Sequence, residues 1–480
     1  MKKILLLVAL AVVYTCGSTK AQTVIAAELQ DELSTQLLGI TFPFINIEYA
    51  VNTYRVVYTG QDAMGQPDTL SGLVGIPQNT NNPQFPIAVY NHATIFTEAD
   101  APSIPGAQER ALVNAFTTSG YITLAPDYLG YGEDADELHP YLHRASEAQA
   151  AKDMVVAVRA WLVEQDIAFN DQLFTTGYSQ GGHSSASFHQ LLETENDPSL
   201  QITAAAHMAG PYIISFSDRL LINDNSLPSI PVYLVFRFLG YNLAYGWYDS
   251  NAALFAEPYL ATIDSFANGQ TELEELNNSL FSQMTANEDG MSDLFQDSIL
   301  AILATNDPAH PIVRDVADND VFAWVPAAPT RLYYCTADMT VPPAVALFTD
   351  STMNALGAPD VASVNAGNFD HLACVIPAAL GALAFFDQFA QVISSVDDLT
   401  IAEPQWQISP NPVGSGQLLQ LRTGDEPATG FRLLDVQGRQ LAGGSILADG
   451  RIQLPDLAQG YYLLQLYRAD RIAVRKIIIE

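Results

Sequence analysis

The sequence predicts an α/β protein with a mainly parallel sheet that helices cover on both faces. Two observations predict it. An antiparallel hairpin is expected near the N-terminus, and from residue 86 onward short apolar runs typical of strands alternate with segments of helical periodicity. We expect strands at residues 86–90, 121–125, 172–176, 202–208, 331–335 and 362–365. We expect helices between most of them, at residues 107–119, 145–165, 182–193 and 343–356.

The hairpin comes before this alternation. Residues 46–58 and 70–76 have the pattern of strands, and the stretch between them turns around Met64 and Gly65. Upstream, residues 23–38 carry apolar side chains at helical spacing, so the sequence predicts an N-terminal helix there.

One gap between expected strands is too long for a loop, because about 120 residues separate the strand at 202–208 from the strand at 331–335. We expect an inserted helical cap over residues 211–328, above the carboxyl edge of the sheet. The cap is rich in aromatic residues, including Phe236, Tyr241, Tyr245, Trp247 and Tyr248. These side chains either line an apolar pocket or form the cap's own core.

The two ends of the chain differ from its body. Residues 1–21 have lysines, then an apolar run too short to span a bilayer, then small residues, which is typical of a secretory signal peptide. Cys16 leaves a lipoprotein signal as the alternative. Residues 22–393 are expected to form the main domain, followed by a polar linker at 394–405.

Residues 406–480 predict a small β-sandwich, because short strands recur there at near-regular spacing with turns between them. These strands are expected at residues 418–421, 431–436, 440–447, 461–467 and 472–479.

The formal net charge is −33, and all of the acidic excess lies before residue 404. Such a surface repels nucleic acid and anionic lipid, so a neutral small molecule or a lipid droplet is the expected partner. Solubility in a salty or extracellular medium is the alternative reason for the charge.

Gly177-Tyr178-Ser179-Gln180-Gly181 lies between an expected strand and an expected helix. A serine with glycine two residues before and two after, in that context, indicates a nucleophile elbow, because so sharp a turn needs Gly177 and Gly181 at its flanks. A strand-to-helix turn with an idle serine is the alternative.

A serine nucleophile needs a base and an acid that orients the base. Asp338 follows the strand at 331–335, and His371 is the one histidine beyond it, between the last strand and the last helix. The order serine, acid, histidine therefore predicts Ser179, Asp338 and His371 as a catalytic set. Asp338 could instead cap the following helix, and Asp370 is a competing acid.

A tetrahedral intermediate needs hydrogen-bond donors for its oxyanion. We expect one from the backbone N–H of Gln180, and one from the loop after the strand at 86–90, where Ala93 and Thr94 lie and Thr94 is preferred. An ordinary strand-end turn is the alternative for that loop.

Cys335 and Cys374 are the two cysteines that remain after signal removal. A bridge between them would join the two loops that carry Asp338 and His371, and two buried free thiols are the alternative. No metal or organic cofactor is expected. His139 and His143 lie amid acidic residues, but Pro140 breaks the helix that would align them on a metal.

The elbow, the His92-Ala93-Thr94 loop, the stretch from Ala125 to Gly132 and the Asp338 and His371 loops together resemble the α/β-hydrolase superfamily, most closely its secretory lipase-type esterases. The resemblance covers residues 46–393 and implies a serine esterase without a cofactor. The family usually has glycine where this chain has Ala93, and a methyl group there narrows the approach of a substrate carbonyl.

The tail resembles the C-terminal sorting domain of the type IX secretion system in Bacteroidetes. The residues that carry this resemblance are Ser409-Pro410-Asn411-Pro412, Leu434 to Arg439, Gln459 to Leu464 and Arg475 to Ile479. It implies passage across the outer membrane, followed by tail removal or surface attachment. A carbohydrate-binding sandwich is the alternative, although Tyr461 and Tyr462 are adjacent and so point to opposite faces.

Together these features predict a secreted or cell-surface serine hydrolase of carboxylic esters, with a small-molecule or lipid ester as substrate and the type IX machinery as partner. No nucleic-acid partner is expected, because the sequence has no basic stripe and no phosphate-binding glycine loop. A serine exopeptidase on the same fold is the nearer alternative, and a catalytically inactive surface-binding module is the more distant one.

Overall fold

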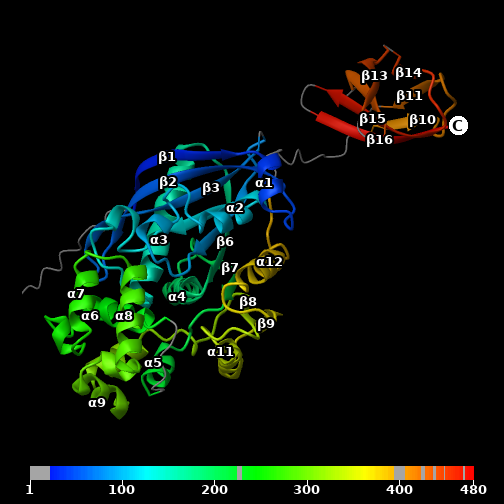
Figure 1. Cartoon of the computed structure of the whole chain (residues 1–480). Helices are drawn as coiled ribbons and strands as arrows, with labels where there is room; N and C mark the ends of the chain where they lie inside the picture. The colour runs from blue at the N-terminus through cyan, green and yellow to red at the C-terminus, as the bar shows by residue number, and fades with distance from the viewer. Residues whose placement is uncertain are drawn as a thin grey trace, which may run out of the picture. The chain divides into compact units, whose positions relative to one another are not determined.

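A nine-stranded sheet runs through the described part of the chain before residue 394, in the order β1-β2-β3-β5-β4-β6-β7-β8-β9 (Figure 1). The strands are β1 (Val24–Leu33), β2 (Ala50–Gln61), β3 (Pro67–Gln78), β4 (Phe85–Asn91), β5 (Ile122–Pro126), β6 (Phe169–Tyr178), β7 (Ile202–Met208), β8 (Thr330–Cys335) and β9 (Val361–Gly367). From β5 to β9 neighbouring strands pair in parallel, whereas β1, β2 and β3 are antiparallel. The predicted mainly parallel sheet and its leading hairpin are confirmed.

The computed structural model describes residues 22–79, 81–223, 230–393, 406–422, 428–435, 439–447, 449–468 and 471–480. The chain divides into two compact units, one up to Ile393 and one from Ser394. The predicted signal peptide at 1–21 and linker at 394–405 lie outside the described residues. Among the described residues, no helix has the length and apolar character needed to cross a membrane.

The predicted helix at residues 23–38 is wrong. Strand β1 occupies most of this segment and pairs with β2 along its length, and the short helix α1 (Thr35–Thr41) follows it. The helix begins where the Ser34 hydroxyl accepts the N–H of Leu37. Arg110 donates to Gln30 and Asp31 on β1, so distant contacts hold this edge strand and override its local periodicity.

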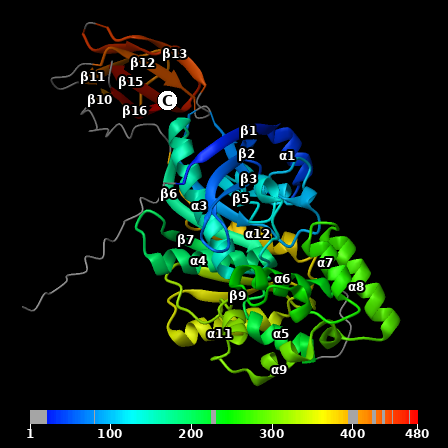
Figure 2. The same cartoon turned by 90° about the vertical axis from the view of Figure 1, so that its left-hand side faces the viewer.

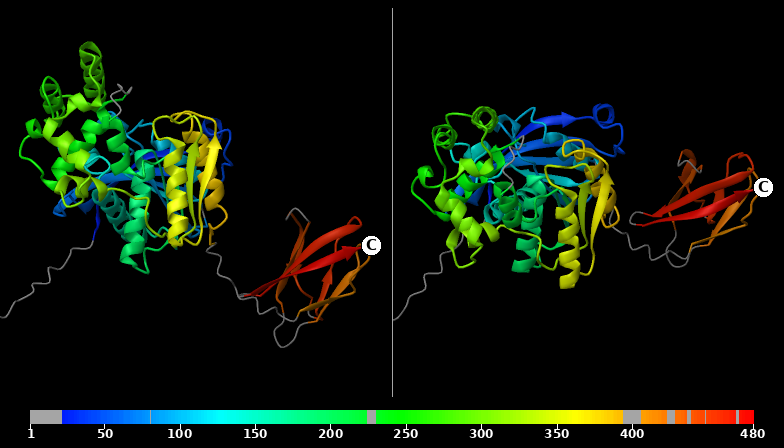
Figure 3. Two further views of the ribbon diagram at one scale, coloured as in Figure 1. Left: turned by 90° about the horizontal axis from the view of Figure 1, so that it is seen from below. Right: turned by 60° about the horizontal axis from the view of Figure 1, so that its bottom comes forward.

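Helices cover both faces of the sheet, as Figures 2 and 3 show. One face packs against α3 (Arg144–Glu164), α4 (Gln180–Glu195) and α11 (Pro343–Leu356), and the other packs against α2 (Arg110–Thr118) and α12 (Val375–Phe386). Short 3-10 turns η1 (Glu98–Asp100) and η2 (Gly132–Asp134) lie in the loops that follow β4 and β5.

A group of helices is inserted between β7 and β8, drawn in green in Figures 1 and 3. This cap consists of α5 (Ile214–Asn223), α6 (Val232–Tyr245), α7 (Leu260–Ala267), α8 (Leu273–Asn287), α9 (Asp297–Thr305) and α10 (Pro311–Ala317), with 3-10 turns η3 (Asn251–Ala253) and η4 (Met291–Leu294). Helix α6 packs closely on the loop after β5, because a Cβ atom on Gly240 would lie 2.7 Å from the backbone nitrogen of Tyr141. The cap therefore lies at the carboxyl edge of the sheet.

The second unit is a pair of antiparallel sheets. One holds β10 (Gln407–Ser409), β11 (Leu418–Arg422) and β14 (Arg451–Gln453), and the other holds β12 (Gly430–Leu434), β13 (Gln440–Ser445), β15 (Gly460–Arg468) and β16 (Arg471–Ile479). Buried side chains of both sheets, including Leu419, Leu433 and Leu464, form one core. The predicted sandwich is confirmed, although the three-residue strands β10 and β14 were not predicted.

Candidate active site

Ser179 is the single residue between strand β6 and helix α4. Its backbone has φ 56° and ψ −116°, which is a strained conformation for a residue with a side chain and costs of the order of 1–3 kcal/mol. Its backbone N–H donates to the carbonyl oxygen of Met208 at 2.9 Å, so strand β7 helps to hold the turn. The predicted strand-turn-helix arrangement around this serine is present.

The glycines that flank Ser179 are needed for space. A Cβ atom on Gly177 would lie 2.2 Å from the carbonyl oxygen of Gly181. A Cβ atom on Gly181 would lie 1.9 Å from the carbonyl oxygen of Asn91, the last residue of β4. Both distances are far below contact, so the turn and the end of β4 approach each other only because these side chains are absent.

Ser179, His371 and Asp338 form a continuous hydrogen-bonded chain, although they lie far apart in the sequence. The Oγ atom of Ser179 is 2.8 Å from Nε2 of His371, and Nδ1 of His371 is 2.6 Å from Oδ2 of Asp338. The second carboxylate oxygen of Asp338 accepts the backbone N–H groups of Thr340 and Val341, each at 2.9 Å. Asp338 is thus fixed by its own loop and directs its other oxygen at the imidazole.

The competing acid, Asp370, has a different role. Its carboxylate accepts the backbone N–H of Ala373 at 2.9 Å, so it stabilises the turn before α12.

Two further contacts hold the loop that carries His371. The hydroxyl of Tyr178 donates to the carbonyl oxygen of His371, and the two rings are 5.2 Å apart. A disulfide joins Cys335, at the end of β8, to Cys374, just before α12, and both residues are fully buried. Tyr178 was inside the predicted elbow motif, but nothing in the sequence indicated that it contacts the histidine loop.

The predicted oxyanion residues all lie near Ser179. Gln180 is the first residue of α4, and a helix leaves the N–H groups of its first turn without helical acceptors. Ala93 and Thr94 line the same cavity as Ser179 and His371. The Thr94 hydroxyl is 2.9 Å from the hydroxyl of Tyr141, which fixes the Thr94 side chain.

The side chain of Gln180 leads to a buried polar network that sequence reasoning missed. Its amide Nε2 donates to a carboxylate oxygen of Glu147, on α3, at 2.8 Å. Glu147 also accepts the N–H of Leu142 at 3.0 Å and the hydroxyl of Ser184, and it lies 3.3 Å from Nδ1 of His183. One carboxylate therefore contacts three residues in the first two turns of α4.

Glu147 is 1% exposed, and burial by itself raises the pKa of a carboxyl group. Hydrogen bonds and electrostatic interactions with His183, His139 and Ser184 outweigh that effect, so the pKa of Glu147 is below its ordinary value. The carboxylate remains ionised at neutral pH.

His139 and His143, weighed from the sequence as metal ligands, are both engaged with the protein. Nδ1 of His139 donates to the carbonyl oxygen of Leu129 at 2.7 Å, and Nε2 accepts from the Gln180 amide at 2.7 Å. Nδ1 of His143 is 2.9 Å from the Ser146 hydroxyl. Burial lowers the pKa of each imidazole to about 4.

A cavity of about 920 Å³ contains Ser179 and His371. Its walls are mainly apolar, and Tyr233 of the cap forms part of them. The other apolar side chains come from the segment after α1, from α2 and from α12: Phe42, Phe44, Ile45, Leu112, Ile376, Leu380 and Leu383. Three apolar side chains in its lining are also exposed, namely Phe44 (81%), Leu372 (83%) and Ile376 (64%).

The aromatic residues named from the cap sequence do not line this cavity. Phe236 and Tyr241 are buried in the cap's own core, and Tyr245, Trp247 and Tyr248 pack against it. The rings of Tyr245 and Trp247 stack 6.0 Å apart, which illustrates the cause: these side chains bury one another. The expectation of an acyl wall built from them is wrong, and the alternative of a cap core is correct.

No protein-family model matches the sequence, and no curated protein sequence matches it. Solved structures do match. The rice cell wall degrading esterase LipA from Xanthomonas oryzae aligns with a TM-score of 0.66 at 22% identity, covering 76% of this chain and 98% of that one. Lipase A from Candida antarctica, in its closed state, aligns with a TM-score of 0.54 at 18% identity, covering 78% of this chain and 84% of that one. The first unit therefore has the α/β-hydrolase fold.

Proposed function

We propose that this chain is a secreted serine hydrolase that cleaves carboxylic esters. The observation that carries the proposal is the chain of hydrogen bonds from Ser179 through His371 to Asp338, at the wall of a large apolar cavity. The structural similarity to an esterase and a lipase supports the same reaction.

In the proposed first half-reaction, Oγ of Ser179 attacks the ester carbonyl carbon while Nε2 of His371 takes the hydroxyl proton. Asp338 accepts the Nδ1–H of His371 and stabilises the imidazolium that forms. The backbone N–H groups of Gln180 and Thr94 donate to the oxyanion. The intermediate then collapses, the bond to the alcohol oxygen breaks, and the alcohol leaves with the proton from His371.

In the second half-reaction, His371 takes a proton from water, and the resulting hydroxide attacks the acyl carbon of the ester on Ser179. The bond between this carbon and Oγ breaks, His371 returns the proton to Oγ, and a carboxylic acid is released. Every proton moves through His371, so no metal or organic cofactor takes part in the proposed cycle.

We further propose that the acyl group of the substrate is apolar. Phe42, Leu112 and Leu383 are among the side chains that surround the approach to Ser179, and apolar chains gain about 25 cal/mol per Å² of surface that they bury. The exposed side chains of Phe44, Leu372 and Ile376 extend this apolar surface outward, which suits an ester that is presented by a droplet or micelle.

Export is also part of the proposal. The sequence features of residues 1–21 and the sorting-domain resemblance of residues 406–480 support secretion through the type IX system. The Cys335–Cys374 disulfide is consistent with an oxidising compartment. Deleting residues 406–480 in a host with this system should leave the protein inside the outer membrane, and unchanged release of the truncated chain would contradict this route.

The experiment that tests the activity is hydrolysis of p-nitrophenyl esters of increasing acyl length by the mature chain, beside Ser179→Ala. We expect turnover by the wild type and a loss of about 10⁶-fold in kcat for the variant. Ser282→Ala, an exposed serine on α8, is the control and should retain full activity. If the wild type cleaves none of the esters but cleaves aminoacyl amides, the chain is a peptidase and the ester proposal fails.

A further inference from the structure

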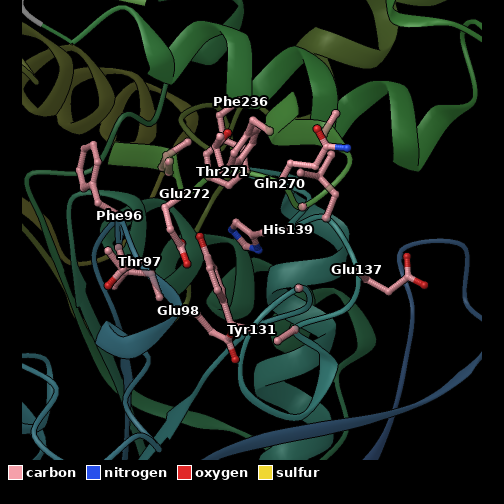
Figure 4. Close-up of a pocket in the computed structure, with 18 of the residues that line it drawn as sticks. Phe96, Thr97, Glu98, Tyr131, Glu137, His139, Phe236, Gln270, Thr271 and Glu272 are labelled. Atoms are coloured by element: carbon pink, nitrogen blue, oxygen red, sulfur yellow. The ribbon is translucent and has the colours of Figure 1, made fainter. Parts of the chain in front are cut away.

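A second cavity, of about 450 Å³, lies between the cap and the loops that follow β4 and β5 (Figure 4). Its wall combines residues 95–98, 130–131 and 135–139 with Phe236 on α6 and the region from α7 to the first turn of α8 in the cap. This volume suits a small organic molecule. None of the steps proposed above for ester hydrolysis at Ser179 assigns a role to this cavity.

Among the residues that the structure describes, five carboxylates and no lysine or arginine line the cavity. The carboxylates belong to Glu98, Asp136, Glu137, Glu272 and Glu275. The imidazole of His139 also forms part of the wall, but burial lowers its pKa to about 4, so it carries no positive charge at neutral pH. The described side chains that line the cavity therefore carry an excess of formal negative charge.

Because the whole chain is acidic, carboxylates alone would not indicate a ligand. Tyr131 supplies an independent observation. It is only 9% exposed and lines the cavity, yet its hydroxyl has no hydrogen-bond partner within the described part of the chain. In contrast, the buried hydroxyls of Tyr58 and Tyr90 donate to Ala150 and Glu109. The Tyr131 side chain is thus largely buried, while its hydroxyl is open to the cavity and free to pair with a ligand atom.

Figure 4 shows how these groups lie in the cavity. The Tyr131 ring extends between Glu272 and His139, Phe236 lies beside the cap helices, and Phe96 lies beyond Glu272 at the left of the view. Aromatic rings attract a cation over their faces and also pack against an apolar body. The wall therefore combines negative charge, an available hydroxyl and aromatic surface.

A metal ion does not fit this arrangement. Among the described residues, no three His, Cys, Asp or Glu side chains converge closely enough to hold one. Metal ions require ligands that meet at a single point, whereas these carboxylates are spread around a wide space. Such a distribution complements a larger cation with an apolar body.

The cavity adjoins the candidate active site. Ile95 and Phe96 line both cavities, and His139 accepts a hydrogen bond from the side chain of Gln180, the residue after Ser179. A cation held here would lie just across this shared wall from the site of ester cleavage.

We propose that this cavity binds a small organic ammonium ion. The ion donates to the Tyr131 hydroxyl and the Glu272 carboxylate, and its apolar body packs against Phe96 and Phe236. The ammonium group belongs either to the alcohol portion of the ester substrate or to a separate ligand. Only the first of these sources depends on the proposed esterase function.

The direct test is calorimetric binding of benzylammonium chloride to the full mature chain, beside benzyl alcohol as the neutral isostere. We expect benzylammonium to bind at least tenfold more tightly, and its affinity to fall as salt screens the carboxylates. Equal affinity for both compounds, or binding of Ca²⁺ but not of benzylammonium, would overturn the proposal. Because this test needs no turnover, it stands even if the esterase proposal fails.

Two variants locate the binding. Glu272→Gln and Tyr131→Phe should each weaken benzylammonium binding by about two- to fivefold. Glu274→Gln removes the same charge two residues further along the chain, in the first turn of α8, but Glu274 does not line the cavity, so this variant should bind as the wild type does. An equal loss in Glu274→Gln and Glu272→Gln would mean that only the general acidity of the chain attracts the cation, and the site would be rejected.

The source of the ammonium group is decided with two matched esters, 3-(dimethylamino)propyl butanoate and 4-methylpentyl butanoate. If the cation belongs to the substrate, kcat/KM should be higher for the charged ester, and Glu272→Gln should remove this preference while leaving hydrolysis of p-nitrophenyl butanoate unchanged. If the cation is a separate ligand, the two esters should react alike and benzylammonium should change their common rate.

Discussion

The side chain of Gln180 donates to Glu147 at 2.8 Å, and this contact links the residue after the proposed nucleophile to a carboxylate buried on another helix. Glu147 also contacts Ser184 and His183 on α4. The start of α4 sets the direction of the Gln180 backbone N–H, which is one of the two proposed oxyanion donors. Glu147 is thus placed to act as a positioning residue for that donor.

Replacing Glu147 by glutamine should therefore impair catalysis more than substrate binding. The amide keeps the size of the carboxylate but removes its charge and its ability to accept several donors at once. We expect kcat to fall by about 10- to 100-fold with little change in KM, because small displacements of catalytic groups have effects of this size. Steady-state kinetics on a p-nitrophenyl ester measures kcat and KM separately. Glu147→Asp should restore part of kcat, and a variant that loses only thermal stability would contradict the positioning role.

Gly181→Ala should disrupt the elbow, since its Cβ atom would lie 1.9 Å from the Asn91 carbonyl oxygen. Either β4 or the turn must move, and we expect a loss of about 1–3 kcal/mol in unfolding free energy together with loss of labelling by a fluorophosphonate probe. Gly39→Ala is the matched control, because a Cβ atom there has no neighbour within 4 Å. Similar behaviour of the two variants would refute the steric explanation.

Asp338→Asn should reduce kcat by about 10⁴-fold while the fold is retained. The amide can still accept the N–H groups of Thr340 and Val341, but it no longer stabilises the imidazolium of His371. Asp370→Asn serves as the comparison, since the Asp370 carboxylate accepts the backbone N–H of Ala373. A larger loss in Asp370→Asn than in Asp338→Asn would reassign the acid.

Acid should destabilise the first unit through His143. Burial lowers the folded-state pKa of His143 to about 4, whereas an unfolded histidine titrates near 6.5. Between these values the unfolded chain binds the additional proton, so this histidine makes the unfolding free energy fall as pH drops from about 6.5 to 4. Asp134 and Asp153 act in the opposite sense, because burial raises their pKa to about 6.

The contribution of His143 is therefore best measured as a difference. Urea unfolding of the wild type and of His143→Asn at several pH values should show that the unfolding free energy falls more steeply toward pH 4 in the wild type. Parallel curves for the two proteins would argue against a neutral, buried His143.

The substitutions Phe44→Ser and Ile376→Ser, at two exposed positions, should lower activity on emulsified long-chain esters but not on soluble short-chain esters. These side chains are 81% and 64% exposed at the mouth of the Ser179 cavity, so the change removes apolar surface without affecting the core. Phe281→Ser, at an exposed position on α8, is the control. An equal loss of activity on both kinds of ester would mean that the substitutions change the shape of the cavity and do not act through the apolar surface at its mouth.

The sequence was informative where chemistry depends on local geometry and chain order. The elbow around Ser179 could be predicted because its glycines, its preceding strand and its following helix are adjacent in the chain. Asp338 and His371 could be predicted as its partners because each follows a strand at the same edge of the sheet.

Features that depend on tertiary contacts were not predictable in this way. Strand β1 was predicted as a helix because its pairing with β2 and its contacts with Arg110 come from other parts of the chain. Glu147 lies within a long helix, where a glutamate normally faces solvent, so nothing local indicated a buried network. The apolar wall around Ser179 comes from the segment after α1, from α2 and from α12, because the cap aromatics pack on one another.

The Cys335–Cys374 bridge, which spans a sequence separation of 39, closes part of the chain into a covalent ring. Asp338 and His371 both belong to this ring, together with α11 and β9, whereas Ser179 lies outside it. The proposed site thus combines a strand-turn-helix segment that presents the Ser179 hydroxyl with a covalently closed segment that carries the proposed acid and base. Opening the ring by reduction would loosen the closed segment and leave the nucleophile's own turn intact.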